Sequence, residues 1–194
     1  MEIESKTEKQ KMLDGDLYLA NDPELVKDRF RARQILRKYN GLSELDLNNE
    51  DLFERRSLIL KELFGNTGDW IWIEPPFYCD YGYNIHLADM VYMNFNCIIL
   101  DPNTVHIGER TMLGPSVQII TADHPLDAEK RVLGPELAAP VKIGKRVWIG
   151  GGAIILPGIA IGDDTTIGAG SVVTKDIPAN VIAVGNPCRV VKKL

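Results

Sequence analysis

The chain has 194 residues, 45% of them hydrophobic, which is enough apolar material for a substantial core and excludes intrinsic disorder as its main state. Its 22 basic and 27 acidic residues give a net charge of −5, so no basic excess is available to bind a nucleic-acid backbone. Because no apolar run approaches the roughly 20 residues of a membrane-spanning helix and no apolar leader is visible, we expect a cytoplasmic protein without a membrane partner.

The segment 1–69 is predicted to be helical, since it is rich in charged residues but holds only 4 of the 17 glycines. Two or three short amphipathic helices are expected. Their predicted limits are Ser5 (in a capping box with Glu8) and Gly15, Asp22 (followed by Pro23) and Gly41, and Asn48 or Asn49 and Gly65. Helices of this length cannot bury their apolar stripes alone, so we expect them to pack against the rest of the chain.

From residue 85 onward the apolar pattern has a period of six. One row is formed by Leu87, Met93, Ile99, Ile107, Leu113, Ile119, Ile143, Ile149, Ile155, Ile161, Ile167 and Val173. Two positions before each of these lies a second small or apolar residue, and positions i and i−2 of a strand face the same side. Twelve units that agree at two positions favour a β-solenoid over chance spacing in an ordinary β-sandwich.

Several segments of the chain resemble a known family. The stretch GAGSVVTKDIPANVIAVGNPCRVV is similar to hexapeptide-repeat acyltransferases, while WIEPPFYCDYGYNIHL, YMNFNC, TADHPLD and VWIGGGAIILPG resemble the maltose and galactoside O-acetyltransferases, which include nodulation acetyltransferases. The opening GDLYLANDPELVKDR resembles the N-terminal helical segment of that group.

The resemblance implies a mainly β fold, a left-handed parallel β-helix with three hexads per coil and therefore about four coils. It divides the chain into an N-terminal α-helical segment, 1–69, and a β-helix acyltransferase domain, 70–194, with an extended loop at 121–140. It also implies a homotrimer with active sites between neighbouring subunits, and acetyl-CoA as the acetyl donor.

The one long interruption of the repeat predicts a functional loop. The aliphatic row resumes at Ile143, a whole number of hexads after Ile119, so 121–140 leaves the solenoid and returns in phase. It contains His124, which falls on the family's catalytic histidine and is expected to act as general base on an attacking hydroxyl. Glu136 is expected either to orient that imidazole or to be a solvated surface carboxylate.

Further site residues are implied by the resemblance. Asp80, Asn94 and Asp101 fall at positions that contact the acceptor sugar or the acetyl group, although Asp and Asn are also common at turns. The coenzyme A side is expected to include Asn94, Trp148, Gly151, Ala169, Thr174, Lys175, Arg189 and Lys192, with Gly151 as an oxyanion donor and the cations close to phosphates. Trp148 is alternatively a subunit contact, and Lys192 and Lys193 a solubilising tail.

The predicted function is acetyl transfer to a hydroxyl of a maltose-, glucose- or galactoside-type sugar by direct attack on acetyl-CoA. Cys79, Cys97 and Cys188 form no CxxC motif and lie outside the loop with His124, so we expect free thiols and no cysteine nucleophile. The alternatives are an amine or other non-sugar acceptor and a non-catalytic trimeric scaffold. A zinc enzyme built on His86, His106 and His124 is disfavoured by their wide spacing, and no metal is expected.

Overall fold

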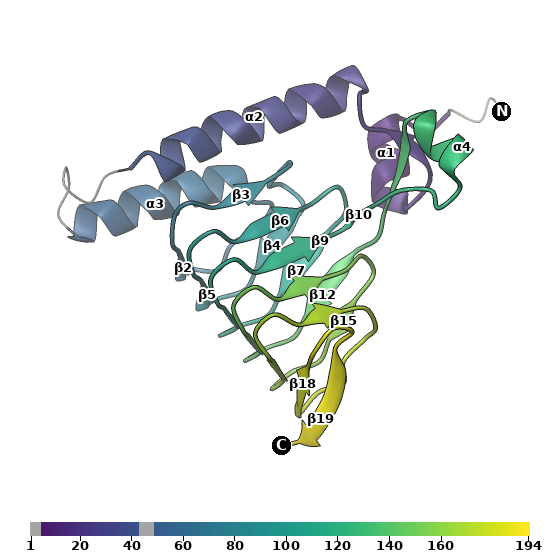
Figure 1. The fold of residues 1–194 in the computed structure, drawn as a ribbon. Coiled ribbons are helices and arrows are strands. Elements are labelled where there is room, and N and C mark those ends of the chain that lie inside the picture. Colours follow the sequence, from purple (N-terminus) through teal and green to yellow (C-terminus); the bar gives the residue numbers. More distant parts are fainter. Residues whose placement is uncertain (1–4, 43–48) are drawn as a thin grey trace.

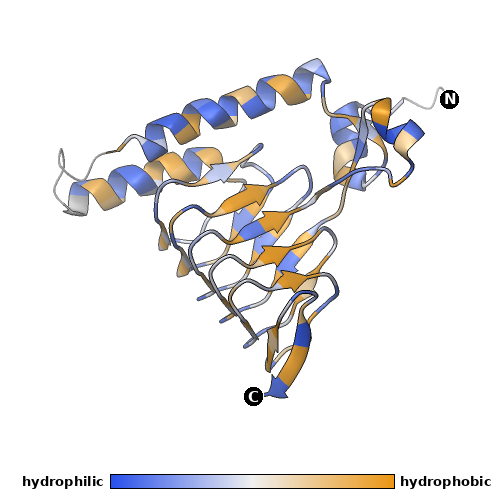
Figure 2. Cartoon of the chain, in the orientation of Figure 1, coloured by the Kyte–Doolittle hydropathy of each residue, from blue (hydrophilic) through white to orange (hydrophobic). Residues whose placement is uncertain are grey.

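The computed structural model describes residues 5–42 and 49–194. A solenoid of short strands forms the body, two long helices lie across its first coil, and a C-terminal hairpin lies at its opposite end (Figure 1). In Figure 2 the strands carry the most hydrophobic colouring, whereas the helices alternate between hydrophobic and hydrophilic residues. None of the helices in the described ranges has the length and apolar character needed to cross a bilayer.

The N-terminal segment contains α1 (Glu8–Asp14), β1 (Tyr18–Leu19), α2 (Pro23–Asn40) and α3 (Asn49–Leu63). The predicted cap Asp22 is confirmed, because its side chain accepts from the Glu24 N–H. The predicted box of Ser5 and Glu8 is wrong: Thr7 caps α1 and exchanges hydrogen bonds with Gln10. Gly15 ends α1 in the left-handed conformation, as predicted. Asn48, one of the two residues predicted to cap α3, lies outside the described residues.

Three parallel sheets form the faces of the solenoid. We call them the β4 face, made of β4 (Ile85–Leu87), β7 (Val105–Ile107), β12 (Val141–Ile143) and β15 (Ala160–Ile161); the β5 face, made of β2 (Ile71–Ile73), β5 (Val91–Met93), β8 (Met112–Leu113), β13 (Trp148–Ile149), β16 (Thr166–Ile167) and β18 (Val181–Val184); and the β6 face, made of β3 (Tyr78–Cys79), β6 (Ile98–Leu100), β9 (Gln118–Ile120), β14 (Ile154–Ile155) and β17 (Val172–Val173). The last strand, β19 (Arg189–Lys193), pairs antiparallel with β18. The predicted mainly β, parallel β-helix fold with N-terminal helices is therefore confirmed.

The solenoid has about six coils rather than the predicted four. A period of three hexads is kept where Trp148 pairs with Thr166. The first two coils are longer than this, because Ile71 pairs with Val91 and Tyr92 with Met112, and near the end the coil that runs from Ile161 to Ile177 is shorter. The first and last coils lie beyond the counted row, because the step from Cys79 to Leu87 and the step from Val173 to Ile177 are not six residues, so counting hexads omits them.

The core is built from the residues of the rows with a period of six. Side chains such as Val91, Ile99 and Ile155 have no exposed surface, and the apolar faces of α2 and α3 cover the first coil with Leu36, Tyr39 and Leu63, among others. The predicted packing of the helices on the body is thus confirmed.

The loop 121–140 is an ordered extension of one corner. It contains β10 (Ala122–Asp123), α4 (Ala128–Val132) and β11 (Pro135–Ala138). β11 pairs with β10 on one side and with β1 of the N-terminal segment on the other, giving a three-stranded antiparallel sheet. This sheet joins two parts of the chain that are far apart in the sequence.

Candidate active site

A cleft of about 310 Å³ lies where the N-terminal segment, the loop 121–140 and the corner between the β6 and β4 faces meet. Its lining residues are Tyr18, Ala20, Arg29, Arg33, Asp80, Tyr81, Leu100, Pro102, Ala122, His124 and Glu136. Three predicted site residues, His124, Glu136 and Asp80, are therefore brought together from separate parts of the sequence. The volume lies at the lower end of the range typical of small-molecule sites.

The three-stranded sheet aligns Tyr18, Glu136 and His124. Tyr18 is paired with Glu136, and Asp123 with Leu137, so continuing that register by one residue places His124 opposite Glu136. The Tyr18 hydroxyl donates a 2.8 Å hydrogen bond to Glu136 Oε2. That Glu136 orients the imidazole of His124 stays a prediction.

The charges of the cleft are distributed around Asp80. Burial raises the pKa of Asp80, the guanidinium groups of Arg29 and Arg33 lower it, and the nearby Glu136 carboxylate raises it further. Arg29 is held in place because its Nη1 donates to the Tyr81 hydroxyl at 2.6 Å. The cleft thus combines carboxylates, guanidinium groups and an exposed imidazole, which suits the recognition of a polyhydroxylated molecule.

Asp101 does not occupy the position expected of an acceptor contact. Its side chain has no exposed surface and accepts hydrogen bonds from the backbone N–H groups of Asp80, Tyr81 and Gly82 at 3.0, 2.9 and 2.8 Å. Burial raises the pKa of Asp101 to about 7, although these donors oppose the rise. Its role here is to shape the loop that carries Asp80, whereas the next residue, Pro102, lines the cleft.

The residues predicted for coenzyme A lie outside this cleft. Trp148 is on the β5 face, and Asn94, Gly151 and Ala169 follow strands of that face at its corner with the β6 face. Thr174 and Lys175 follow β17 at the corner between the β6 and β4 faces. Arg189 and Lys192 are in β19. The width of the β6 face separates Gly151 from His124, so a single chain does not bring the two together. The glycines permit close approach of coils: a Cβ on Gly150 would lie 2.5 Å from the Ala169 nitrogen.

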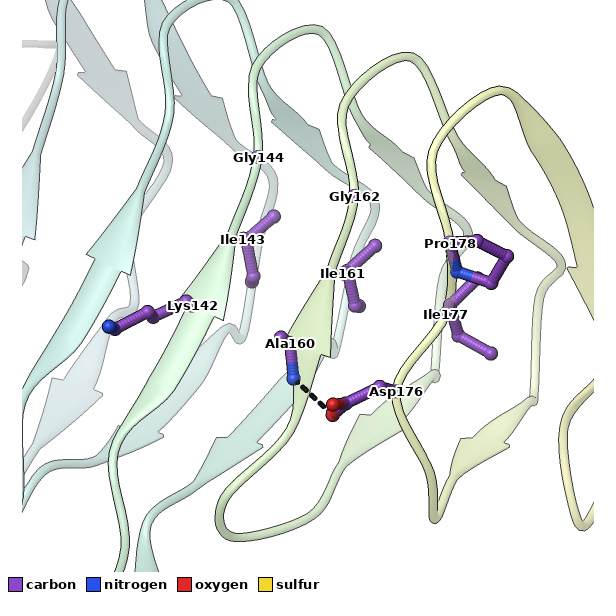
Figure 3. A pocket seen from close by; sticks show the side chains of 9 residues that line it. All are labelled: Lys142, Ile143, Gly144, Ala160, Ile161, Gly162, Asp176, Ile177 and Pro178. Carbon is purple, nitrogen blue, oxygen red and sulfur yellow. Dashed lines mark hydrogen bonds between the residues drawn. The ribbon is translucent and has the colours of Figure 1, made fainter.

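A second hollow lies on the β4 face and is lined by Lys142, Ile143, Gly144, Ala160, Ile161, Gly162, Asp176, Ile177 and Pro178 (Figure 3). The Asp176 carboxylate accepts from the Ala160 N–H at 2.8 Å and thereby connects two coils. The hollow contains no histidine and none of the predicted site residues.

The histidines do not form a metal centre. His86 and His106 lie on neighbouring strands of the β4 face with stacked rings whose centroids are 4.6 Å apart, whereas His124 is in the loop. Within residues 5–42 and 49–194, no three His, Cys, Asp or Glu side chains gather as a group that could hold a metal ion.

Comparisons with known proteins cover both parts of the chain. Residues 11–68 match the maltose acetyltransferase hexapeptide capping motif, and residues 140–175 match the bacterial transferase hexapeptide model. A maltose O-acetyltransferase structure from Clostridium difficile 630 is 53% identical, with a TM-score of 0.93 over 97% of this chain and 98% of that one. The chain belongs to the maltose and galactoside O-acetyltransferase family.

Two further similar proteins extend the comparison. Nodulation protein L of Rhizobium meliloti is 52% identical over 96% of this chain and 98% of its own length. A galactoside acetyltransferase in complex with coenzyme A is 37% identical, with a TM-score of 0.88 over 97% of this chain and 92% of that one. The predicted family membership is thus confirmed, and so is the class of acyl-CoA-dependent acetyltransferase.

The two family models leave the loop 121–140 almost entirely between their matched ranges, so their matches do not test the prediction for His124. Among the polar residues that line the cleft, sequence reasoning missed Tyr18, Arg29, Arg33 and Tyr81. No local pattern in the helical segment indicates which of its residues meet the loop. The pairing of β1 with β11 is the long-range contact that decides this.

Proposed function

We propose that this protein transfers the acetyl group of acetyl-CoA to a hydroxyl of a maltose-, glucose- or galactoside-type sugar, with His124 as general base. The observation that carries the proposal is the convergence of His124, Glu136 and Asp80 on one cleft. Similarity to a maltose O-acetyltransferase and a galactoside O-acetyltransferase supports the class of acceptor, and the coenzyme A complex of a galactoside acetyltransferase supports the donor.

The reaction is a direct transfer. The imidazole of His124 accepts the hydroxyl proton as the sugar oxygen attacks the thioester carbonyl, and a tetrahedral intermediate forms. The carbon–sulfur bond then breaks, the His124 imidazolium donates the proton to the sulfur of coenzyme A, and coenzyme A leaves as the thiol. Direct transfer needs no cysteine nucleophile. Nor does the cleft offer one, because Cys79, Cys97 and Cys188 are all buried and none of them lines it. Burial raises the pKa of Cys97 to about 11, which disfavours its thiolate.

The acceptor is held by polar groups that surround the imidazole. Asp80 accepts hydrogen bonds from sugar hydroxyls, and Arg33, which is exposed at the cleft, donates to sugar oxygens. Glu136 orients the His124 ring and balances the positive charge that develops on it.

Acetyl-CoA lies along the residues predicted for it. The Gly151 N–H stabilises the thioester oxyanion, and Asn94, Trp148, Ala169 and Thr174 line the arm of the donor. Lys175, Arg189 and Lys192 are exposed cations suited to its phosphates.

The active sites lie between subunits of a homotrimer. Separation of Gly151 from His124 by the β6 face requires a neighbouring chain to complete each site. The β5 face and its corner with the β6 face expose Trp148, Met112 and Phe95 by 55, 49 and 51%, and Tyr78 on the β6 face is 50% exposed. Apolar side chains gathered in this way favour burial against another copy of the chain.

The test is release of free coenzyme A thiol from acetyl-CoA with maltose, glucose, a thiogalactoside, glucosamine and simple amines as acceptors. We expect sugar-dependent release that falls by about two orders of magnitude or more in His124→Ala. The matched control is His106→Ala, an exposed histidine on the β4 face, which should keep the native rate.

Each other result would reject a stated part of the proposal. Release with amines alone would reject the sugar acceptor, and binding of acetyl-CoA without acceptor-dependent release would reject both acceptor classes in the panel. Absence of acetyl-CoA binding would leave a non-catalytic scaffold. A sedimentation-equilibrium mass of one chain would reject the trimer.

A further inference from the structure

Tyr18 lies at one end of a row of three residues that lines the cleft and ends at the proposed base. β1 places it opposite Glu136, and its hydroxyl donates to Glu136 Oε2 at 2.8 Å. The continued β10–β11 register places His124 on the far side of Glu136, and all three residues line the cleft. The first member of this row comes from the N-terminal segment and the other two from the loop 121–140.

We propose that Tyr18 is a positioning residue for acetyl transfer: its hydroxyl holds the Glu136 carboxylate in the orientation that aligns the His124 imidazole. The proposal rests on the proposed function, because it gives Tyr18 a role only if His124 is the base. The N-terminal segment would then be part of the catalytic apparatus as well as a cover for the first coil.

The surroundings of Tyr18 keep its hydroxyl in the donor form. The side chain is 1% exposed, and burial together with the hydrogen bond to Glu136 and the charges of Tyr81 and Asp80 raises the pKa of the phenol. A phenol that keeps its proton donates to one carboxylate oxygen and leaves the other, Oε1, for the imidazole. Fixing one oxygen limits rotation of the carboxylate and thereby the positions available to the ring.

Anchoring of the loop is achieved by a different residue. The buried Asn103 side chain donates to the carbonyl oxygens of Met12, Leu13 and Ala138, at 3.2, 3.1 and 3.4 Å. The Asn103 backbone N–H also donates to Thr121 Oγ1 at 2.9 Å. These bonds hold α1 and the loop together without the Tyr18 hydroxyl, so the bond to Glu136 is available for orientation.

The test removes the hydroxyl and keeps the ring. In Tyr18→Phe we expect kcat to fall about tenfold, the effect of losing one hydrogen bond to a charged group, while KM for acetyl-CoA and for the sugar stays within about twofold. The matched control is Tyr39→Phe, which removes another buried tyrosine hydroxyl, the one that donates to the Ile73 carbonyl beneath the helices. Tyr39→Phe should change the melting temperature and leave kcat at the native value.

A double-mutant cycle separates orientation from general packing. If Tyr18 acts through Glu136, adding Tyr18→Phe to Glu136→Gln should lower kcat no further. A tenfold loss that persists in the Glu136→Gln background, or an unchanged kcat in a folded Tyr18→Phe, would overturn the proposal.

The two proposals fail in different ways. Glu136→Gln keeps the Tyr18 ring in place, so an unaltered kcat in that variant overturns the role of Tyr18 even if Tyr18→Phe does not fold. Native activity in His124→Ala would instead reject the general base. Loss of activity in His124→Ala together with native kcat in Tyr18→Phe would reject only the present inference.

Discussion

Replacing Asp101 with Asn tests whether a buried carboxylate builds the loop of the cleft. Asp101 Oδ1 accepts from two backbone N–H groups, those of Asp80 and Tyr81, and Oδ2 accepts from that of Gly82. An asparagine can keep the two bonds to its single oxygen, but its NH2 group would then face the Gly82 N–H. Asp101→Asn therefore leaves one buried donor unsatisfied and sets two donors against each other.

One unsatisfied buried donor costs about 1–3 kcal/mol, so we expect the free energy of unfolding to fall by about 2 kcal/mol. The measurement is urea unfolding followed by circular dichroism at pH 8, above the pKa of about 7 to which burial raises Asp101, so that the native carboxylate is ionised. The kcat/KM for the sugar should fall as well, because Asp80 and Tyr81 line the cleft.

Asp176→Asn is the matched control. Asp176 is exposed and its Oδ1 accepts from one backbone N–H, that of Ala160, which an asparagine oxygen can still do. We expect a loss below about 0.5 kcal/mol there. If Asp101→Asn lost no more than Asp176→Asn, the burial cost of the charge would outweigh its three hydrogen bonds and the reasoning would be refuted.

Two further predictions concern the solenoid itself. Burial and the neighbouring His106 lower the pKa of His86, so near the unfolded-state pKa of about 6.5 the unfolded chain binds more protons than the folded one. The free energy of unfolding should therefore rise as the pH rises towards about 6.5, and His86→Asn should flatten this rise in urea titrations. An equal slope in both proteins would contradict the prediction. In Gly150→Ala the new Cβ would lie 2.5 Å from the Ala169 nitrogen, so neighbouring coils must separate. Thermal unfolding should show that the free energy of unfolding falls by about 1–3 kcal/mol. An unchanged melting temperature would show that this corner is not tightly packed.

The helices and the repeating body could be predicted because their signals are local. Asp22 before Pro23 indicates a helix start from neighbouring residues alone, and aliphatic residues six apart, such as Ile149, Ile155 and Ile161, show which side chains face inward. Where the local signal changes, prediction failed: the steps from Cys79 to Leu87 and from Val173 to Ile177 are not six residues, so hexad counting missed the coil that begins at Ile71 and the coil that begins at Ile177. The cap of α1 failed because Ser5 with Glu8 and Thr7 with Gln10 fit the same pattern of capping residues.

The site was only partly accessible to the same reasoning. The loop that leaves and re-enters the repeat in phase is conspicuous, and the family resemblance pointed to His124 and Glu136 within it. Nothing near Tyr18 or Arg29 indicates that either lines the same cleft. For Asp101, residue type suggested hydroxyl recognition, whereas the structure directs its carboxylate to three backbone donors of the preceding coil. A carboxylate serves either purpose, and only its neighbours decide which.

By itself, the sequence determined that the chain forms helices followed by a β-solenoid with one long loop, because these features follow from periodicities and caps that span a few residues. Only the tertiary structure decided that β1 pairs with β11, that the row from Tyr18 through Glu136 leads to His124, and that the β6 face separates Gly151 from the cleft. The physical reason is that backbone pairing between distant strands depends on how the helical segment packs on the first coil. No short stretch of sequence specifies that packing, because it is the result of burying many apolar side chains together.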